Sequence, residues 1–254
     1  MQIRPEYPRL DYGHQYANGL VFAGLAPARF VGSMYYHDSS LYGNNGTLTN
    51  MDPSAWEFFP EIGRFGLRFS AGTSVVALSR TLELGTEYSI SMLVYPTTIA
   101  GDSRDVLTNA AASTYRITST ALQQHIAGTF NEIDSSGTLS TDSWKQIGLI
   151  RKGSGTDLDW YLNGSLTQSD TSDATDEFSV DYIGNNAGTN NDYIGIISDI
   201  LICRGQNPEI MTALTDPSNV MLSGLIMPPR RVLFPVATSS PPVVTYRPMM
   251  MQVC

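Results

Sequence analysis

Apolar and polar residues alternate over many short segments of this chain, a pattern that predicts β-strands. The pattern is clearest in residues 144–204. Every second residue of 157–162 is apolar, and these side chains share one face because successive side chains of a strand point to opposite faces. Asn163-Gly164 follows directly and is a strong signal for a two-residue hairpin turn. We therefore expect 144–204 to form an antiparallel meander of long apolar strands.

Similar short apolar runs precede this stretch, and turn residues separate them at nearly regular intervals. The strands that they predict are 20–25, 30–36, 66–69, 74–78, 87–95, 106–107, 115–118, 122–127 and 129–133. Because Ala71-Gly72-Thr73 lies between two of these runs, we expect 66–69 and 74–78 to pair as a hairpin. In 87–95 the alternate residues from Tyr88 onward are apolar, which predicts one core-facing side.

One stretch after the meander has a helical pattern. Asn207 is a suitable N-cap, Pro208 fits the first helical position and Glu209 suits the positive end of a helix. The apolar residues of 210–214 would face the core, and Asp216-Pro217 would end the helix. Many short strands with so little helix predict an all-β fold. We expect a jelly-roll sandwich, in which two antiparallel sheets each bury one face against the other.

The two ends of the chain differ from its middle. Residues 1–18 are polar and contain Pro5 and Pro8, so we expect an extended N-terminal arm. Residues 226–254 are rich in proline and methionine, and dense prolines favour extended backbone. The sequence therefore predicts a sandwich at 19–225 between two arms.

The C-terminal segment has two interpretations. It carries three arginines and no acidic residue, together with apolar side chains in which disordered linkers are usually poor. It is either an unstructured terminus or an arm that docks on a neighbouring subunit. The candidate docking residues are Arg230, Arg231, Phe234, Tyr246 and Arg247.

Composition narrows the range of partners. The 254 residues suffice for one large β domain or two small domains. A formal net charge of -9 argues against nucleic-acid binding, which needs Lys and Arg to displace counterions from phosphate. No apolar run could span a bilayer and no apolar leader follows Met1, so we expect no membrane partner and synthesis in a host cytoplasm. Cys203 and Cys254 make no disulfide framework, and Cys203 is expected to be a small buried residue.

Several segments resemble, in the expected order, motifs of one family. These segments are Asp38–Leu48, Gly66–Ser70, Tyr88–Pro96, Trp144 with Trp160–Gly164, Ile183-Gly184 with Tyr193–Ile200, and Pro208–Ile210. Together they resemble the laminin-G-like branch of the concanavalin A-like lectin/glucanase superfamily, over about residues 19–216. The resemblance implies a jelly roll of two curved antiparallel sheets. It does not choose a function, because this family hosts sugar binding, adhesion, glycan hydrolysis and structural modules.

The catalytic motif of the family is incomplete. Its glucanases carry E-x-D-x-x-E on one strand, where one carboxylate attacks the sugar and another donates a proton. Glu132-Ile133-Asp134 begins this pattern, but Ser135, Ser136 and Gly137 follow and the second glutamate is missing. Without an acid/base partner the retaining mechanism fails. We therefore expect no enzymatic activity and no catalytic residues.

Calcium is a common cofactor in the family and requires several oxygen ligands at one site. The hairpin position that is acidic in many relatives is 70–74 here, and it contains no acid. Other acidic residues are alternative oxygen donors, although solvated loop charges are the favoured interpretation. They are Asp38, Asp170, Asp173, Asp176 and Glu177. The three histidines, His14, His37 and His125, lack metal-ligand spacing. We expect no cofactor, with calcium as the alternative.

The first functional hypothesis is a non-enzymatic structural protein of a bacteriophage particle, either a capsid decoration (cement) protein or a tail component. Leaderless chains with one laminin-G-like module resemble such proteins, and extended arms supply contact area on a neighbour. The expected partners are the major capsid or tail protein and other copies of this chain. The expected location is the virion.

The alternative is a glycan-binding, lectin-like module for attachment to a host surface. The amides of a Gly/Asn-rich loop at 184–191 could hydrogen-bond sugar hydroxyls. The candidate glycan-binding residues are Asn185, Asn186, Asn190, Asn191 and Tyr193. Tyr182, Tyr193 and Trp56 could stack on a sugar ring, but packing in the core is the commoner role of such residues.

Overall fold

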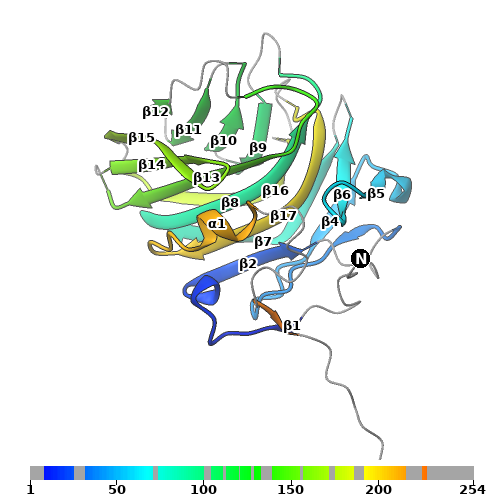
Figure 1. Ribbon diagram of the computed structural model, residues 1–254, viewed down its shortest axis with the longest axis horizontal. Helices are drawn as coiled ribbons and strands as arrows, with labels where there is room; N and C mark the ends of the chain where they lie inside the picture. The colour runs from blue at the N-terminus through cyan, green and yellow to red at the C-terminus, as the bar shows by residue number, and fades with distance from the viewer. Residues whose placement is uncertain are drawn as a thin grey trace, which may run out of the picture.

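The structure is a computed structural model that describes residues 9–25, 32–70, 74–99, 104–110, 113–119, 121–126, 129–132, 139–154, 157–171, 175–185, 192–215 and 225–227. These residues form two eight-stranded sheets packed face to face (Figure 1). The predicted all-β sandwich is confirmed.

The two sheets have no strand in common and are called sheet A and sheet B. The strands of each are given in their spatial order. Sheet A runs β12 (Thr129–Glu132), β11 (Leu122–Ile126), β10 (Thr114–Ile117), β9 (Arg104–Thr108), β16 (Phe178–Ile183), β7 (Val75–Gly85), β4 (Gly46–Thr49) and β3 (Tyr35–Tyr36). Sheet B runs β15 (Ser165–Thr171), β14 (Asp157–Leu162), β13 (Lys145–Lys152), β8 (Glu87–Pro96), β17 (Gly195–Arg204), β6 (Arg64–Phe69) and β5 (Trp56–Phe59), and β2 (Leu20–Leu25) also pairs with β17. The strands of each sheet pair antiparallel.

The main core lies between the sheets, and β8 contributes one whole face to it. Tyr88, Ile90, Met92 and Val94 have no exposed surface, which confirms the predicted core-facing side of this strand. The intervening residues Ser89, Ser91 and Leu93 point to the other face and are buried too. Leu93 belongs there to a second apolar cluster, on the outer face of sheet B. β8 is therefore a central strand with both faces covered.

Helix α1 (Ile210–Ala213) and segments from both ends of the described chain cover the outer face of sheet B (Figure 1). The second cluster contains Leu10, Tyr16, Ala17, Leu20, Ala23, Leu25, Ile62, Leu93, Ile150, Leu201, Cys203, Ile210, Met211, Ala213, Leu214, Leu225 and Ile226. Burial raises the pKa of Cys203 to about 12, so its thiol stays neutral. Cys203 is a small buried residue, as expected.

Parts of both predicted arms are built into the fold. β1 (Arg9–Leu10) pairs with β18 (Ile226–Met227), and the N–H of Asp11 donates to the carbonyl of Leu225 at 2.8 Å. A 3-10 turn, η1 (Gln15–Ala17), packs Tyr16 onto sheet B. The few apolar residues in these polar segments cover a face that water would otherwise reach. Boundaries at 18/19 and 225/226 therefore cut through packed structure, whereas 1–8 and 228–254 lie outside the described residues.

The predicted meander is correct for its first three strands. β13, β14 and β15 are consecutive neighbours in sheet B. Asn163 and Gly164 join β14 to β15 with φ values of 50° and 78°, as a hairpin turn of the favoured hand requires. β16, however, lies in sheet A, and β17 returns to sheet B beside β8. β17 has nine buried residues in its ten, which suits the centre of a sheet rather than the edge that a meander would give it.

The predicted hairpin of 66–69 with 74–78 is wrong. β6 lies in sheet B and β7 in sheet A, so the chain crosses between the sheets after Ser70. β6 is already paired with β5 on one side and with β17 on the other. No edge of β6 is left for β7, which pairs instead with β4 and β16. The predicted strand 30–36 is described from residue 32 onward, and only its last two residues, β3, form a strand.

The predicted apolar face of α1 is confirmed, but its predicted cap is wrong. The Nδ2 group of Asn207 donates to the carbonyls of Gln15 (3.2 Å) and Asn18 (2.9 Å), which ties η1 to the helix region. Asn207 therefore links two segments by hydrogen bonds and is not the N-cap. Glu209 precedes the helix without a capping hydrogen bond from its side chain. Among the helices of the described residues, none is long and apolar enough to cross a membrane.

β17 changes its neighbour halfway along its length. Residues 195–197 pair with β6, whereas 199–203 pair with β2, and the register with β8 shifts between these two parts. At this point Nη1 of Arg64 lies 2.6 Å from Oδ2 of Asp199, and neither side chain is exposed. The hydroxyl of Ser198 donates to the carbonyl of Phe65 at 2.8 Å. A buried ion pair thus lies at the point along β17 where its neighbour changes from β6 to β2.

We predict that Arg64→Ala destabilises the protein strongly, by about 3–5 kcal/mol, because it leaves the Asp199 carboxylate buried without its cation. Arg68→Ala on the same strand is the matched control. Arg68 pairs with Glu57 at the surface, where such pairs contribute at most about 1 kcal/mol. Urea unfolding of both variants measures the difference. Equal losses would contradict a special role for the buried pair.

Candidate functional site

A pocket of about 250 Å³ with polar and apolar surface in equal parts opens near β4, β5 and β6. These strands lie on the right side of Figure 1. Its lining residues are Asn50, Met51, Asp52, Ser54, Ala55, Glu57, Arg68, Ser70 and Ser74. They come from the end of β4, the 3-10 turn η3 (Pro53–Ala55), β5, β6 and the start of β7. The pocket therefore lies where the chain passes between the two sheets.

The turn η3 sets one wall of the pocket. Oδ1 of Asp52 accepts the N–H of Ser54 at 2.8 Å, and Pro53 occupies the first position, as is usual at the start of a helical turn. This backbone hydrogen bond lowers the pKa of Asp52. Asn50 precedes the turn with a positive φ of 54°, a conformation that asparagine tolerates better than most residues. The wall thus presents a carboxylate that is ionised at neutral pH.

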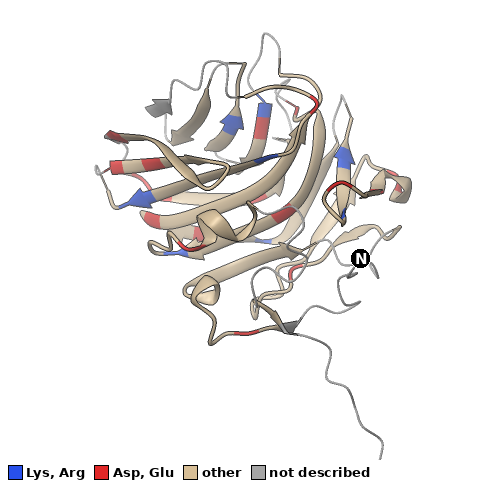
Figure 2. Ribbon diagram, in the orientation of Figure 1, with Lys and Arg blue, Asp and Glu red and all other residues tan. Residues whose placement is uncertain are grey.

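The opposite wall is an ion pair on the β5–β6 hairpin. Glu57 is paired in register with Gly66, which places its side chain on the same sheet face as that of Arg68, two residues further on. Nε and Nη2 of Arg68 donate to the two carboxylate oxygens of Glu57, the second at 2.6 Å. These hydrogen bonds lower the pKa of Glu57 and raise that of Arg68. Figure 2 shows where charged residues lie on the ribbon around β5 and β6.

Neutral groups complete the pocket. The hydroxyls of Ser70 and Ser74 lie 3.4 Å apart, and Ser74 also reaches the carbonyl of Asn50 at 3.4 Å. Met51 and Ala55 are half-buried and pack against the main core, so their apolar atoms back the pocket. The site thus combines carboxylate acceptors, guanidinium and hydroxyl donors, and an apolar surface as large as the polar one.

Two of the residues expected to bind a glycan lie inside the protein. Tyr193 has no exposed surface, its ring packs edge-on against Phe69, and its hydroxyl donates to the carbonyl of Ile196 at 3.1 Å. Asn185 is 1% exposed, and its carbonyl accepts the hydroxyl of Thr108. Neither side chain is presented to a sugar at the surface, which corrects the expectation for both. Asn186, Asn190 and Asn191 lie outside the described residues and stay predictions.

The other aromatic candidates divide between the core and the surface. Trp56 is 6% exposed and stacks on Tyr36 with ring centroids 5.6 Å apart, so it has the core role that was the alternative. Tyr182 is half-buried on β16. The five candidate docking residues, Arg230, Arg231, Phe234, Tyr246 and Arg247, all lie outside the described residues. Their role therefore stays a prediction.

Asp38 organises a loop and does not offer oxygens to a cation. Its carboxylate is 1% exposed and accepts the N–H groups of Ala23, Ser40 and Asn44 at 2.7–2.9 Å, and also the hydroxyl of Ser40. Four donors directed at one carboxylate would repel a cation. This network ties the 38–44 loop to β2, and it replaces the calcium interpretation of Asp38.

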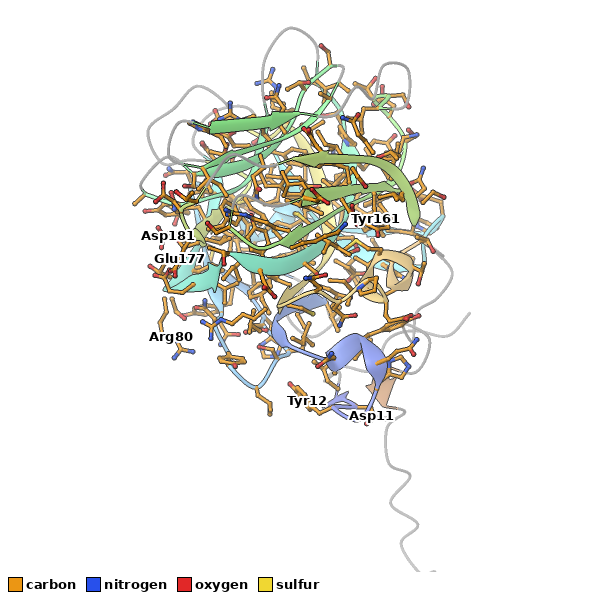
Figure 3. The ribbon with its side chains drawn as sticks, turned by 90° about the vertical axis from the view of Figure 1, so that its left-hand side faces the viewer. Asp11, Tyr12, Arg80, Tyr161, Glu177 and Asp181 are labelled. Atoms are coloured by element: carbon orange, nitrogen blue, oxygen red, sulfur yellow. The ribbon has the colours of Figure 1, made fainter. Side chains whose placement is uncertain are left out.

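The other calcium candidates that the structure describes are Asp170, half-exposed on β15, Asp176 and Glu177. Glu177 lies exposed at the surface (Figure 3), and the carbonyl of Asp176 accepts a hydrogen bond from Arg151 at 2.8 Å. Asp173 lies outside the described residues. Within the part of the chain that the structure describes, no three His, Cys, Asp or Glu residues are grouped so that they could hold a metal ion.

Of the pocket residues, the sequence singles out only those in the segment 70–74, as a calcium position without an acid. One further signal is the opposite charge of Glu57 and Arg68 on two segments that the structure pairs as β5 and β6. Asn50 and Asp52 are residue types that indicate only a turn. They lie beside Arg68 because β6 and β7 belong to different sheets, whereas the sequence predicts that 66–69 and 74–78 pair with each other.

Comparison with known protein families identifies the fold. The model of the concanavalin A-like lectin/glucanases superfamily (Laminin_G_3) matches residues 70–205, more than half of the chain. The chain belongs to this superfamily. No curated protein matches the sequence of this concanavalin A-like chain.

Solved structures of low sequence identity share the fold. Domain 4 of AbnA, an extracellular GH43 arabinanase from Geobacillus stearothermophilus solved with arabinotriose, is 15% identical with a TM-score of 0.58, and the match covers 76% of this chain and 96% of that one. The binding domain of Paraclostridial Mosquitocidal Protein 1 is 14% identical with a TM-score of 0.56, over 80% of this chain and 52% of that one. The ligand binding domain of botulinum neurotoxin serotype D, solved with N-acetylneuraminic acid, is 14% identical with a TM-score of 0.54, over 83% and 53%. This chain thus spans nearly all of the arabinanase domain but about half of the toxin domains.

A second charged group of this concanavalin A-like domain is buried in sheet A and is not part of the pocket. Asp105 on β9 has no exposed surface, and its Oδ1 lies 3.0 Å from Nε of Arg116 on β10. Burial raises the pKa of Asp105 from 3.8 to about 6, the cation of Arg116 opposes this shift, and the nearby Asp192 adds to it. Because its carboxylate is inaccessible, this residue affects stability rather than ligand binding.

We predict that Asp105 makes the stability of the fold depend on pH. A folded-state pKa above the unfolded value means that the folded protein binds the proton more tightly. The contribution is complete below about pH 4 and is lost as the pH rises through about 6. The free energy of unfolding of wild type minus that of Asp105→Asn should therefore fall, by on the order of 2 kcal/mol from about pH 4 to pH 7. Urea unfolding across this range measures it, and parallel pH profiles would refute it.

Proposed function

We propose that this domain binds carbohydrate through the pocket that is lined by Asn50, Met51, Asp52, Ser54, Ala55, Glu57, Arg68, Ser70 and Ser74. The observation that carries the proposal is the chemistry of the lining. Carboxylates, a guanidinium, an amide and hydroxyls converge on one small space that is backed by Met51. A sugar ring presents many hydroxyls, each of which both donates and accepts, together with apolar C–H groups. A few fixed polar groups with an apolar backing are what binds such a molecule.

The size of the pocket suits a small part of a glycan. Its volume of about 250 Å³ lies just below the usual range for ligand pockets of roughly 300–1,000 Å³. A single sugar residue, at a chain end or a branch, fits this size better than a long polymer segment does. The Glu57–Arg68 pair would hold its polar groups in position before binding, which reduces the ordering cost.

The known neighbours support this choice at the level of fold. Two structurally similar domains were solved with the sugars arabinotriose and N-acetylneuraminic acid. Identities of 14–15% carry no residue-level correspondence. The support is therefore that a domain matched over 96% of its length was solved with a sugar, and the pocket supplies the argument for this chain.

The pocket favours binding over hydrolysis. A glycosidase needs one carboxyl group with a raised pKa that donates a proton at neutral pH. Hydrogen bonds lower the pKa of both carboxyl groups in the pocket, Asp52 and Glu57. Neither is set up as a general acid, and we propose a binding module without catalysis.

The role in a bacteriophage particle stays a prediction. It rests on the resemblance to leaderless chains with one laminin-G-like module and on the expected arms, and the five docking residues of the C-terminal arm all lie beyond the described part of the chain. A sugar-binding pocket is compatible with that role, because a particle protein that contacts a host surface could carry one.

We predict that the protein retains carbohydrate on a glycan array that includes neutral sugars such as arabinotriose and acidic sugars such as N-acetylneuraminic acid as separate probes, and that Arg68→Ala weakens the binding of each retained glycan by about tenfold or more. The loss of charge-assisted hydrogen bonds supports this magnitude, because they contribute about 1.5–3 kcal/mol each. Arg80→Ala, an exposed arginine outside the pocket (Figure 3), is the matched control and should bind normally. An array without signal, or full binding by Arg68→Ala, would refute the proposed function.

A further inference from the structure

We infer that the pocket selects neutral sugars and discriminates against sugars that carry a carboxylate. The inference rests on the proposed function and specifies its ligand class. It follows from the net charge of the lining and from the way in which the single guanidinium is already engaged.

The lining carries an excess of negative charge. Among the residues that line the pocket, the charged ones are Asp52, Glu57 and Arg68, so two carboxylates face one cation. Both carboxyl groups are held ionised by hydrogen bonds. A uronic acid or a sialic acid would add a third carboxylate to this small space and be repelled by like charge.

Arg68 is not available as a carboxylate receptor. A guanidinium recognises a carboxylate best through two parallel N–H groups, and Arg68 already donates Nε and Nη2 to the two oxygens of Glu57. An acidic sugar would have to displace Glu57 and leave that carboxylate without its partner. The remaining N–H groups of the guanidinium can still donate singly, which suits hydroxyl and ring oxygens.

The carboxylates require a ligand that donates hydrogen bonds. An ionised carboxylate only accepts, and so does the carboxylate of an acidic sugar. Every hydroxyl of a neutral sugar can donate to Glu57 or Asp52, and Ser70 and Ser74 can donate or accept as the ring requires. The hydroxymethyl group of a neutral hexose therefore fits where the carboxylate of the corresponding uronic acid does not.

The test uses sugar polymers that are matched in glycosidic linkage, so that the two members of a pair differ at this group. Three matched pairs are glucan with glucuronan, galactan with galacturonan, and mannan with mannuronan, measured against the full chain by affinity electrophoresis at low and high salt. In each pair that binds, we expect the neutral member to bind about tenfold tighter, equivalent to 1.4 kcal/mol. This ratio should shrink as salt screens the repulsion.

Two variants test the mechanism. Glu57→Gln removes one negative charge and frees the fork of Arg68, so binding of the acidic member should rise and the ratio should fall about fivefold or more. Asp52→Asn, which keeps a good N-cap residue, should shift the ratio in the same direction and serves if Glu57→Gln does not fold. Glu177→Gln makes the same charge change at an exposed position outside the pocket (Figure 3) and should leave the ratio unchanged.

The outcomes separate this inference from the proposed function. Wild type that binds acidic members as tightly as neutral ones, or more tightly, overturns the inference and leaves carbohydrate binding in place. An unchanged ratio in both pocket variants also overturns it, because the charges would not set the selectivity. Binding to none of the six polymers, together with a glycan array without signal, counts against the proposed function itself.

Discussion

The buried ion pair between Arg64 and Asp199 fixes the point at which the neighbour of β17 changes from β6 to β2. β17 is the one strand of sheet B that contacts β8, β6 and β2, and its two possible neighbours on one side compete for the same edge. A carboxylate placed at the change of partner allows only one register, because any slip would leave a charge in an apolar interior. The position of β6, and with it that of Arg68, depends on this constraint.

The pocket also depends on the position of β6. β6 ends in sheet B and β7 begins in sheet A, so the backbone near Ser70 and Ser74 leaves both ladders and opens a space at the end of the sandwich. Apart from Met51 and Ala55, which pack against the main core, the side chains that face this space are polar or charged. A rigid scaffold therefore presents a site whose walls can vary in sequence while the packing of β8 and β17 is unchanged.

Local features were predictable from the sequence, whereas the partners of the strands were not. Asn163-Gly164 specifies its hairpin because both residues tolerate positive φ, and the alternation from Tyr88 specifies a core face. The assignment of β7 and β16 to sheet A depends on which edges are already occupied, and this is a property of the whole fold. The expectation for Tyr193 failed for the same reason, since an aromatic residue beside an Asn-rich loop has the same local sequence whether it is buried or exposed. Burial of the predicted arm residues Leu10 and Ile226 likewise depends on a sheet face that only the assembled sandwich provides.

The pairing of β1 with β18 also sets how the domain responds to mechanical load. Arg9 lies opposite Met227 and Leu10 opposite Ile226, so the chain enters and leaves at the same end of this short ladder. Tension applied through the two ends pulls the strands apart like a zipper, one hydrogen-bonded pair after another, instead of shearing all pairs together. The small terminal sheet would thus yield first and absorb extension, while the strands that carry the pocket remain paired.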